Sequence, residues 1–223
     1  MSHPRLCALV ISGSPAATDI ALIKRLAKQS DFILAVDSGA DALIAAELLP
    51  DLLLGDFDSI DQETLQFCRA QEVELETHDT NKDATDIELA LTRLLSEGYN
   101  SIVATKVLGG RIDHELASLA CFVRLAQQGV KVAIIETNQT CLFLSSSSEL
   151  RRLCIDTTTE PMPAIISLIP WASDVNVSIK GVRWELDHET LTLHGTRGLS
   201  NVPKADHVDI EIHEGTIIVV LEN

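Results

Sequence analysis

The sequence predicts two domains, an α/β domain followed by a small all-β domain. Up to residue 138, short apolar runs alternate with segments whose apolar residues recur at helical spacing. From residue 139 the helical spacing disappears, and apolar and polar residues alternate as in strands that bury one face. We therefore expect a doubly wound, mostly parallel sheet over residues 1–138 and a β-sandwich over residues 139–223.

The strands of the first domain are expected at short apolar or β-branched runs, namely residues 7–11, 32–36, 52–54, 73–76, 102–108 and 131–135. Helices are expected between them, because apolar residues recur at i, i+3, i+4 and i+7 from Ile87 and again from Leu116. Gly129 follows the second pattern as a C-terminal cap. Ligands of such sheets bind at the carboxyl ends of the strands.

The second domain is expected to contain two hairpins. One would join residues 208–212 to 217–221 across a turn at 213–215, and the other would join 184–186 to 191–193. A run of four serines at 145–148 is either a boundary between the domains or the tip of an exposed hairpin.

The composition excludes several classes of protein. Asp and Glu number 33 against 17 Lys and Arg, a net charge of −16, which argues against a nucleic-acid partner. An anionic nucleotide remains compatible with this charge, because a metal and a few local cations can reverse the field at one site. Five scattered cysteines without a CxxC pair predict reduced thiols, and the apolar runs are too short to cross a membrane. We expect a soluble, cytoplasmic protein.

Three motifs of the first domain carry candidate chemistry. In the first, Asp56 and Asp58 directly follow an apolar strand and Gly55. In an extended segment residues i and i+2 point the same way, so two carboxylates would emerge together, an arrangement that suits Mg²⁺. The alternative is that they only cap a loop, with Asp58 as a helix N-cap.

The second motif begins at Asn81 and continues to Glu88. Asp83 resembles a helix N-cap, and Asp86 lies three residues later, so a capping role is the simpler interpretation. The functional interpretation makes Lys82 a phosphate contact and Asp86 a further metal ligand.

The third motif, Gly109 to His114, lies between a strand and a helix. Its paired glycines allow close approach of a ligand, and Arg111 can grip a phosphate. Asp113 could instead be an N-cap and His114 a surface histidine. Asp37 and Ser38 follow another strand, so four strand ends carry groups suited to a metal–polyphosphate complex.

Taken in order, DSGA, GDFDS, KDATDIELAL, GGRIDHELAS, KGVRWEL and LSN resemble the motifs of the thiamine pyrophosphokinase family over nearly the whole chain. The resemblance implies an α/β nucleotide-binding domain, a thiamine-binding β-sandwich and a homodimer with active sites at the subunit interface. It also implies transfer of the pyrophosphoryl group of ATP, the co-substrate, to the hydroxyl of thiamine, giving thiamine diphosphate and AMP.

The resemblance assigns roles to individual residues. Mg²⁺ would be held by Asp56, Asp58 and Asp86, which with Arg111 form the catalytic group. The nucleotide side would comprise Asp37, Ser38, Lys82, Asp83, Thr85, Arg111, Asp113 and His114. Thiamine would stack on Trp184 and meet polar groups of Ser200 and Asn201, although Trp184 could equally be a core residue of the sandwich.

Two other functions remain open at this point. A metal-dependent phosphatase could use the carboxylates of Asp56 and Asp58, in a manner similar to the haloacid dehalogenase superfamily. The DxD motif of that superfamily follows the first strand, whereas the motif of this sequence follows roughly the third. A noncatalytic protein that binds thiamine or a nucleotide is the other alternative.

Overall fold

The computed structural model describes residues 6–79, 83–159 and 162–222. The chain forms two compact units, residues 1–121 and 122–223. This division falls inside helix α5 (Ile112–Gln127). The functional boundary expected between residues 138 and 139 stays a prediction.

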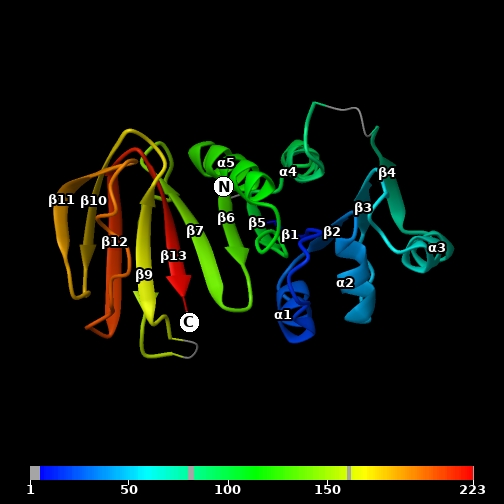
Figure 1. The fold of residues 1–223 in the computed structure, drawn as a ribbon, viewed down its shortest axis with the longest axis horizontal. Coiled ribbons are helices and arrows are strands. Elements are labelled where there is room, and N and C mark those ends of the chain that lie inside the picture. Colours follow the sequence, from blue (N-terminus) through cyan, green and yellow to red (C-terminus); the bar gives the residue numbers. More distant parts are fainter. Residues whose placement is uncertain (1–5, 80–82, 160–161, 223) are drawn as a thin grey trace. The chain divides into compact units, whose positions relative to one another are not determined.

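The first unit contains a parallel sheet in the strand order β4-β3-β2-β1-β5 (Figure 1). Its strands are β1 (Cys7–Ile11), β2 (Phe32–Val36), β3 (Leu52–Gly55), β4 (Glu74–Thr77) and β5 (Ser101–Thr105). Leu9, Leu34 and Leu53 are fully buried, as expected for strands covered on both faces. The prediction of a parallel sheet is confirmed.

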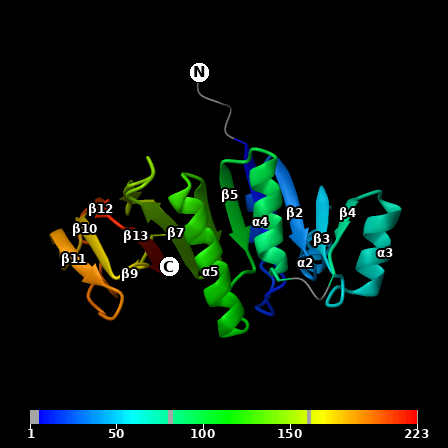
Figure 2. The ribbon, with the colours of Figure 1, turned by 90° about the horizontal axis from the view of Figure 1, so that it is seen from above.

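Helices cover both faces of this sheet. They are α1 (Ile20–Ala27), α2 (Gly39–Ala45), α3 (Gln62–Ala70) and α4 (Asp86–Ser96). The chain advances from β1 to β4 in one direction and then returns to β5, so right-handed crossovers place α4 opposite α1 and α2 (Figure 1). Helix α4 contacts β2 and β3 and lies along their face (Figure 2).

The helix N-caps differ from those considered in the sequence. Asp61 caps α3 and Thr85 caps α4, each in an extended conformation with its side-chain oxygen accepting a bond from a backbone amide of the first turn (2.7 and 3.3 Å). Asp58 and Asp83 are therefore not caps, because each lies too far before its helix. Asp113 lies inside the first turn of α5.

The second unit is a β-sandwich, as predicted. One sheet contains β6 (Lys131–Ile135), β7 (Gln139–Ser145), β13 (Thr216–Glu222) and β9 (Ile165–Pro170) in that order. The other contains β11 (Leu186–Thr192), β10 (Asp174–Lys180), β12 (His207–Glu214) and β8 (Arg152–Asp156). Apolar residues of both sheets, among them Ile166, Val177 and Ile217, form one core cluster.

The hairpin predicted across residues 213–215 is wrong. Strands β12 and β13 are consecutive but belong to different sheets, so the chain crosses the sandwich at Gly215, which has a φ of +88°. The chain also crosses after β7, at the serine run. The Ser146 amide donates to the Gly215 carbonyl (3.0 Å), and the Gly215 amide donates to the Ser146 hydroxyl (3.0 Å). The serines thus tie two sheet-crossing corners together and are not a hairpin tip.

The second predicted hairpin is also wrong. Residues 186–192 form the single strand β11, which pairs with β10 so that Leu191 lies opposite Val175. Leu186 and Leu191 are both buried although they are five residues apart, because the pairing of β10 with β11 shifts register between Val177 and Ile179. Trp184 precedes this strand and is 54% exposed, so it is not a core residue.

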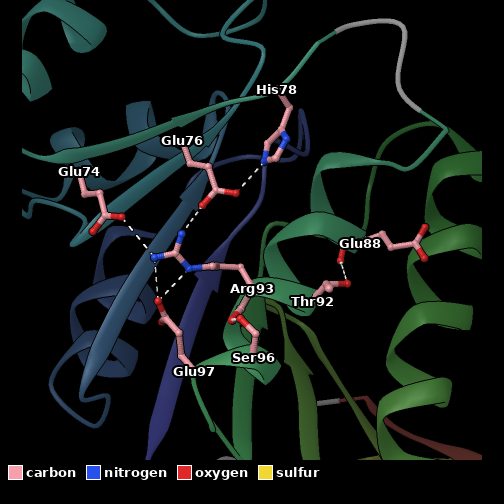
Figure 3. A network of polar contacts seen from close by, with 8 residues as sticks. All are labelled: Glu74, Glu76, His78, Glu88, Thr92, Arg93, Ser96 and Glu97. Atoms are coloured by element: carbon pink, nitrogen blue, oxygen red, sulfur yellow. Dashed lines mark hydrogen bonds and ion pairs between the residues drawn. The ribbon is translucent and has the colours of Figure 1, made fainter.

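An ion-pair network holds the edge strand β4 to α4 (Figure 3). The Arg93 guanidinium binds the carboxylates of Glu76 (2.5 Å), Glu97 (2.8 Å) and Glu74 (3.2 Å), and His78 adds a contact to Glu76 (2.8 Å). The carboxylates raise the pKa of Arg93, with the hydrogen bond to Glu97 as the largest cause. The network ties the last turn of α4, the helix that begins at Asp86, to the edge strand.

Two expectations from the composition can be compared with the structure. All five cysteines are free thiols, as predicted. Among the residues that the structure describes, no helix combines the length and the apolar character needed to cross a bilayer.

We expect Arg93→Ala to lower the free energy of unfolding by about 1–2 kcal/mol, because three neighbouring carboxylates lose their shared cation. Thermal unfolding followed by circular dichroism measures this as a fall of the midpoint by several degrees. Arg69→Ala, at an exposed arginine of α3, is the control. Equal midpoints for the two variants would show that the network does not stabilise the unit.

Candidate active site

A cleft of about 720 Å³ lies at the carboxyl ends of the strands of the first unit. It contains most of the residues that the sequence singled out in this unit, namely Asp37, Ser38, Asp56, Asp58, Thr85, Asp86, Arg111 and His114. Asp83 and Asp113 do not line it, and Lys82 lies outside the described residues. The four strand ends proposed from the sequence therefore do converge.

The strand order explains why the cleft forms here. Strands β1 and β5 are neighbours, and the connections that leave them turn to opposite faces of the sheet. A crevice opens at such a switch point. The loop 12–15 after β1 and the loop 107–111 after β5 both line the cleft.

The loop after β1 was missed in the sequence, because its residues do not complete a known phosphate-binding fingerprint. It is attached firmly to the end of β5. The Ser14 hydroxyl donates to the Leu108 carbonyl (2.5 Å), and the nearly buried Lys106 ammonium donates to the Ala16 carbonyl (2.6 Å). The signal that could have found this loop is the run Ser12-Gly13-Ser14 directly after a strand.

The segment that carries Asp56 and Asp58 is a tight turn and not an extended strand. Phe57 has a φ of +64° and a nearly buried ring, and the Asp58 amide donates to the Asp56 carboxylate (3.1 Å). The Phe57 amide donates to Asp37 (3.2 Å), whose carboxylate occupies the space that a Cβ on Gly55 would need. Both carboxylates reach the cleft, although the turn rather than strand periodicity puts them there.

The carboxylates of Asp56, Asp58 and Asp86 supply hard oxygen donors of the type that suits Mg²⁺. Among the described residues, no three His, Cys, Asp or Glu side chains already converge as a metal site. Mg²⁺ commonly takes only one or two protein carboxylates and completes its shell with water and phosphate oxygens. The donor set therefore fits this metal together with a polyphosphate.

The glycine loop already has an anionic partner in the protein. The Glu115 carboxylate accepts bonds from the amides of Gly109 (2.8 Å) and Gly110 (2.7 Å). Glu115 was not singled out in the sequence. Its position in the first turn of a helix that follows two glycines is the signal that could have found it.

Arg111 and Asp113 form a bidentate ion pair at the exposed rim of the cleft. The Arg111 Nε and Nη2 atoms lie 3.2 and 2.6 Å from the two Asp113 oxygens. The hydrogen bond from Arg111 lowers the pKa of Asp113 from 3.8 to about 2. Arg111 lines the cleft, whereas Asp113 does not line it and instead orients the Arg111 guanidinium.

The three residues expected to meet thiamine lie in the second unit. Trp184 is exposed, and the Arg183 guanidinium lies over its ring at 4.7 Å from the centroid. Ser200 is exposed and has a φ of +54°. Asn201 is buried, and its side chain bonds to the backbone of Trp184.

Comparison with known protein families identifies one and the same family in two segments of the chain. The family model "Thiamin pyrophosphokinase, catalytic domain" matches residues 23–134, which is just over half of the chain. The model "Thiamin pyrophosphokinase, vitamin B1 binding domain" matches residues 152–217. The chain belongs to the thiamine pyrophosphokinase family.

Individual members of the family resemble this chain along most of its length. The thiamine pyrophosphokinase of Bacillus subtilis is 26% identical over 168 residues, 74% of this chain and 75% of the relative. Thiamine pyrophosphokinase 1 of Oryza sativa is 26% identical over 169 residues, 72% of this chain and 62% of the relative.

Solved structures of thiamine pyrophosphokinases share the fold. The Bacillus subtilis crystal structure superposes with a TM-score of 0.82 at 23% identity and covers 97% of this chain and 99% of that one. The Candida albicans structure gives 0.82 at 15% identity, with coverage of 98% and 90%. The predicted fold class, an α/β domain and a β-sandwich, is thus that of the family.

We expect Arg111→Met to raise the pKa of Asp113 from about 2 to its ordinary value of 3.8. The pKa is lowered in the folded chain, so the ion pair is fully formed above about pH 4 and is lost as the pH falls through about 2. A carboxyl ¹³C NMR titration measures this shift, with Arg183→Met as the control. An unchanged pKa in R111M would show that Arg111 does not hold Asp113 in solution.

Removal of the Glu115 side chain should loosen the glycine loop. In Glu115→Ala the amides of Gly109 and Gly110 lose a charged acceptor, so their hydrogen exchange should become about tenfold faster, equivalent to about 1.4 kcal/mol. Exchange of a peptide that covers residues 107–112 measures the effect, and Glu63→Ala in α3 is the control. Equal exchange in both variants would contradict the prediction.

Proposed function

We propose that this chain is a Mg²⁺-dependent thiamine pyrophosphokinase that transfers the pyrophosphoryl group of ATP to the hydroxyl of thiamine. The products are thiamine diphosphate and AMP. The chain belongs to this family, and one observation carries the proposal. Asp56, Asp58 and Asp86, the glycine loop and Arg111 all line one cleft. In line with the family resemblance, residues 1–138 would bind the nucleotide and residues 139–223 thiamine.

Asp56, Asp58 and Asp86 would hold the metal. When bound, Mg²⁺ neutralises charge on the phosphate oxygens and orients the polyphosphate. The turn at Phe57 fixes two of these carboxylates, and Asp86, the first residue of α4, is fixed by the Thr85 cap. The acidic cleft would otherwise repel a polyphosphate, so the metal also explains how a chain with a charge of −16 accepts ATP.

The remaining nucleotide contacts would come from the cleft's other residues. Arg111 presents its guanidinium to the phosphates, where charge increases as the bond to AMP breaks. Ser38, Thr85 and His114 supply further polar groups, and Asp37 fixes the turn at Phe57. Lys82, Asp83 and Asp113 keep their predicted places on the nucleotide side as part of this proposal.

The reaction needs little covalent chemistry from the protein. The thiamine hydroxyl attacks the β-phosphorus of ATP, the bond from that phosphorus to the α-phosphate oxygen breaks, and AMP leaves. Asp86 would accept the hydroxyl proton. Positioning and charge stabilisation supply most of the rate, because a loose transition state at phosphorus gains little from a base.

Thiamine would stack its flat pyrimidine ring on Trp184, and Ser200 would add a polar contact. As the resemblance implies, the active protein would be a homodimer whose active sites lie at the subunit interface. We also propose a cytoplasmic location, with neither a membrane nor a nucleic acid as partner.

The test is a product assay with purified protein, thiamine, ATP and Mg²⁺. The proposal expects thiamine diphosphate and AMP in equal amounts, and neither when thiamine or the metal is omitted. ADP with thiamine monophosphate would contradict pyrophosphoryl transfer. Inorganic phosphate with a trapped aspartyl phosphate would indicate the phosphatase. Thermal stabilisation by thiamine or ATP without any product would indicate the noncatalytic binding protein.

We expect Asp56→Asn to lower turnover about a hundredfold or more, since each tenfold loss requires only about 1.4 kcal/mol of transition-state stabilisation. The thermal midpoint should change little, because the carboxylate is half-buried and its bond to the Asp58 amide lies within its own turn. Asp206→Asn, at an exposed loop of the second unit, is the control. Normal turnover with normal metal dependence in D56N would exclude Asp56 as a metal ligand.

A further inference from the structure

Trp184 lies on a short connection, residues 181–185, between β10 and β11. It is 54% exposed, which is unusual for a tryptophan in a unit with a well-formed core. A solvent-exposed indole on a short loop would ordinarily sample several orientations. Something in the structure must therefore decide where this ring points.

The connection is held along one side by residues 201–205. The Arg183 amide donates to the Val202 carbonyl (2.8 Å), and the Lys204 amide donates to the Gly181 carbonyl (2.9 Å). Val182 and Pro203 form an isolated antiparallel bridge. These bonds fix the loop on either side of Trp184 but do not satisfy the backbone of Trp184 itself.

Asn201 provides the missing bonds. Its Oδ1 atom accepts from the Trp184 amide (3.0 Å), and its Nδ2 donates to the Trp184 carbonyl (2.7 Å). The amide side chain thus pairs with Trp184 as a neighbouring strand would. Asn201 is only 4% exposed, and its own backbone is paired in both directions with Ile166 (2.9 Å each).

Little of the Asn201 side chain remains for a ligand. A side-chain amide can accept two hydrogen bonds and donate two. Oδ1 also accepts from the Val202 amide (3.0 Å), so three of these four positions are filled inside the protein. Asn201 therefore suits the support of another residue better than direct contact with a small molecule.

We propose that Asn201 is a positioning residue that fixes Trp184 for stacking of the flat pyrimidine ring of thiamine. The inference rests on the proposed function, in which Trp184 receives that ring. The Arg183 guanidinium covers one face of the indole, so the ring of the ligand stacks on the other. Holding the indole before binding removes part of the ordering cost that a mobile side chain would incur.

A double-mutant cycle tests whether Asn201 acts through Trp184. Asn201→Ala should raise the KM for thiamine by about three- to tenfold, with kcat within about twofold and the KM for ATP unchanged. In a Trp184→Ala background the same change should have no further effect. Asn176→Ala is the matched control, because that side chain also bonds to a backbone carbonyl, of His188, on the outer side of β10.

Fluorescence tests the positioning without substrate. The chain has two tryptophans, so Trp171→Phe leaves Trp184 as the sole tryptophan, which is excited selectively at wavelengths that tyrosine does not absorb. N201A should lower the anisotropy of Trp184 and increase its quenching by acrylamide, whereas N176A should change neither. If N201A does not fold, Asn201→Asp, which keeps the acceptor and loses the donor to the Trp184 carbonyl, replaces it in both experiments.

The outcomes separate the two proposals. An unchanged thiamine KM in W184A removes Trp184 from the thiamine site, whereas the anisotropy still decides whether Asn201 fixes the ring. A further rise of the thiamine KM when N201A is added to W184A would mean direct contact and would overturn the positioning role. Unchanged anisotropy and quenching in N201A would overturn it as well.

Discussion

The common direction of five parallel strands is the constraint on which the candidate active site depends. All their carboxyl ends lie at one edge, so residues from distant parts of the sequence meet there. The return of the chain to β5 beside β1 opens the crevice at that edge. The chemistry of the protein is thus placed by strand order, and its precision comes from the bonds that hold each loop.

Those bonds are mostly charged or directed to the backbone. Arg93 ties the last turn of α4 to β4, the Lys106 ammonium bonds to the loop after β1, and the Glu115 carboxylate accepts bonds from the amides of the glycine loop. In the second unit Asn201 does the same for Trp184. In each case a side chain outside the proposed chemistry orders a segment that carries it, which lowers the conformational entropy lost on binding.

Sequence patterns predicted the strands of the first unit to within a few residues and most of its cleft residues, because buried parallel strands are continuous apolar runs and polar groups follow them. The two predicted hairpins of the second unit were wrong. The sequence shows that a strand exists but does not show which strand it pairs with. Alternation in residues 208–212 and 217–221 is the same whether the strands pair directly or face each other across a sandwich. Asp58 and Asp83 were considered as caps because composition alone does not show where the first helical turn begins.

The place of β13 has a consequence for biosynthesis. This strand covers residues 216–222, yet it lies inside its sheet, paired with β7 on one side and β9 on the other. The strands of the first unit have all been translated by residue 105, well before β13. Until residue 222 has emerged from the ribosome, β7 and β9 each keep the edge that β13 later covers unpaired. Unpaired strand edges promote aggregation, so this is the interval in which a nascent chain most needs chaperones.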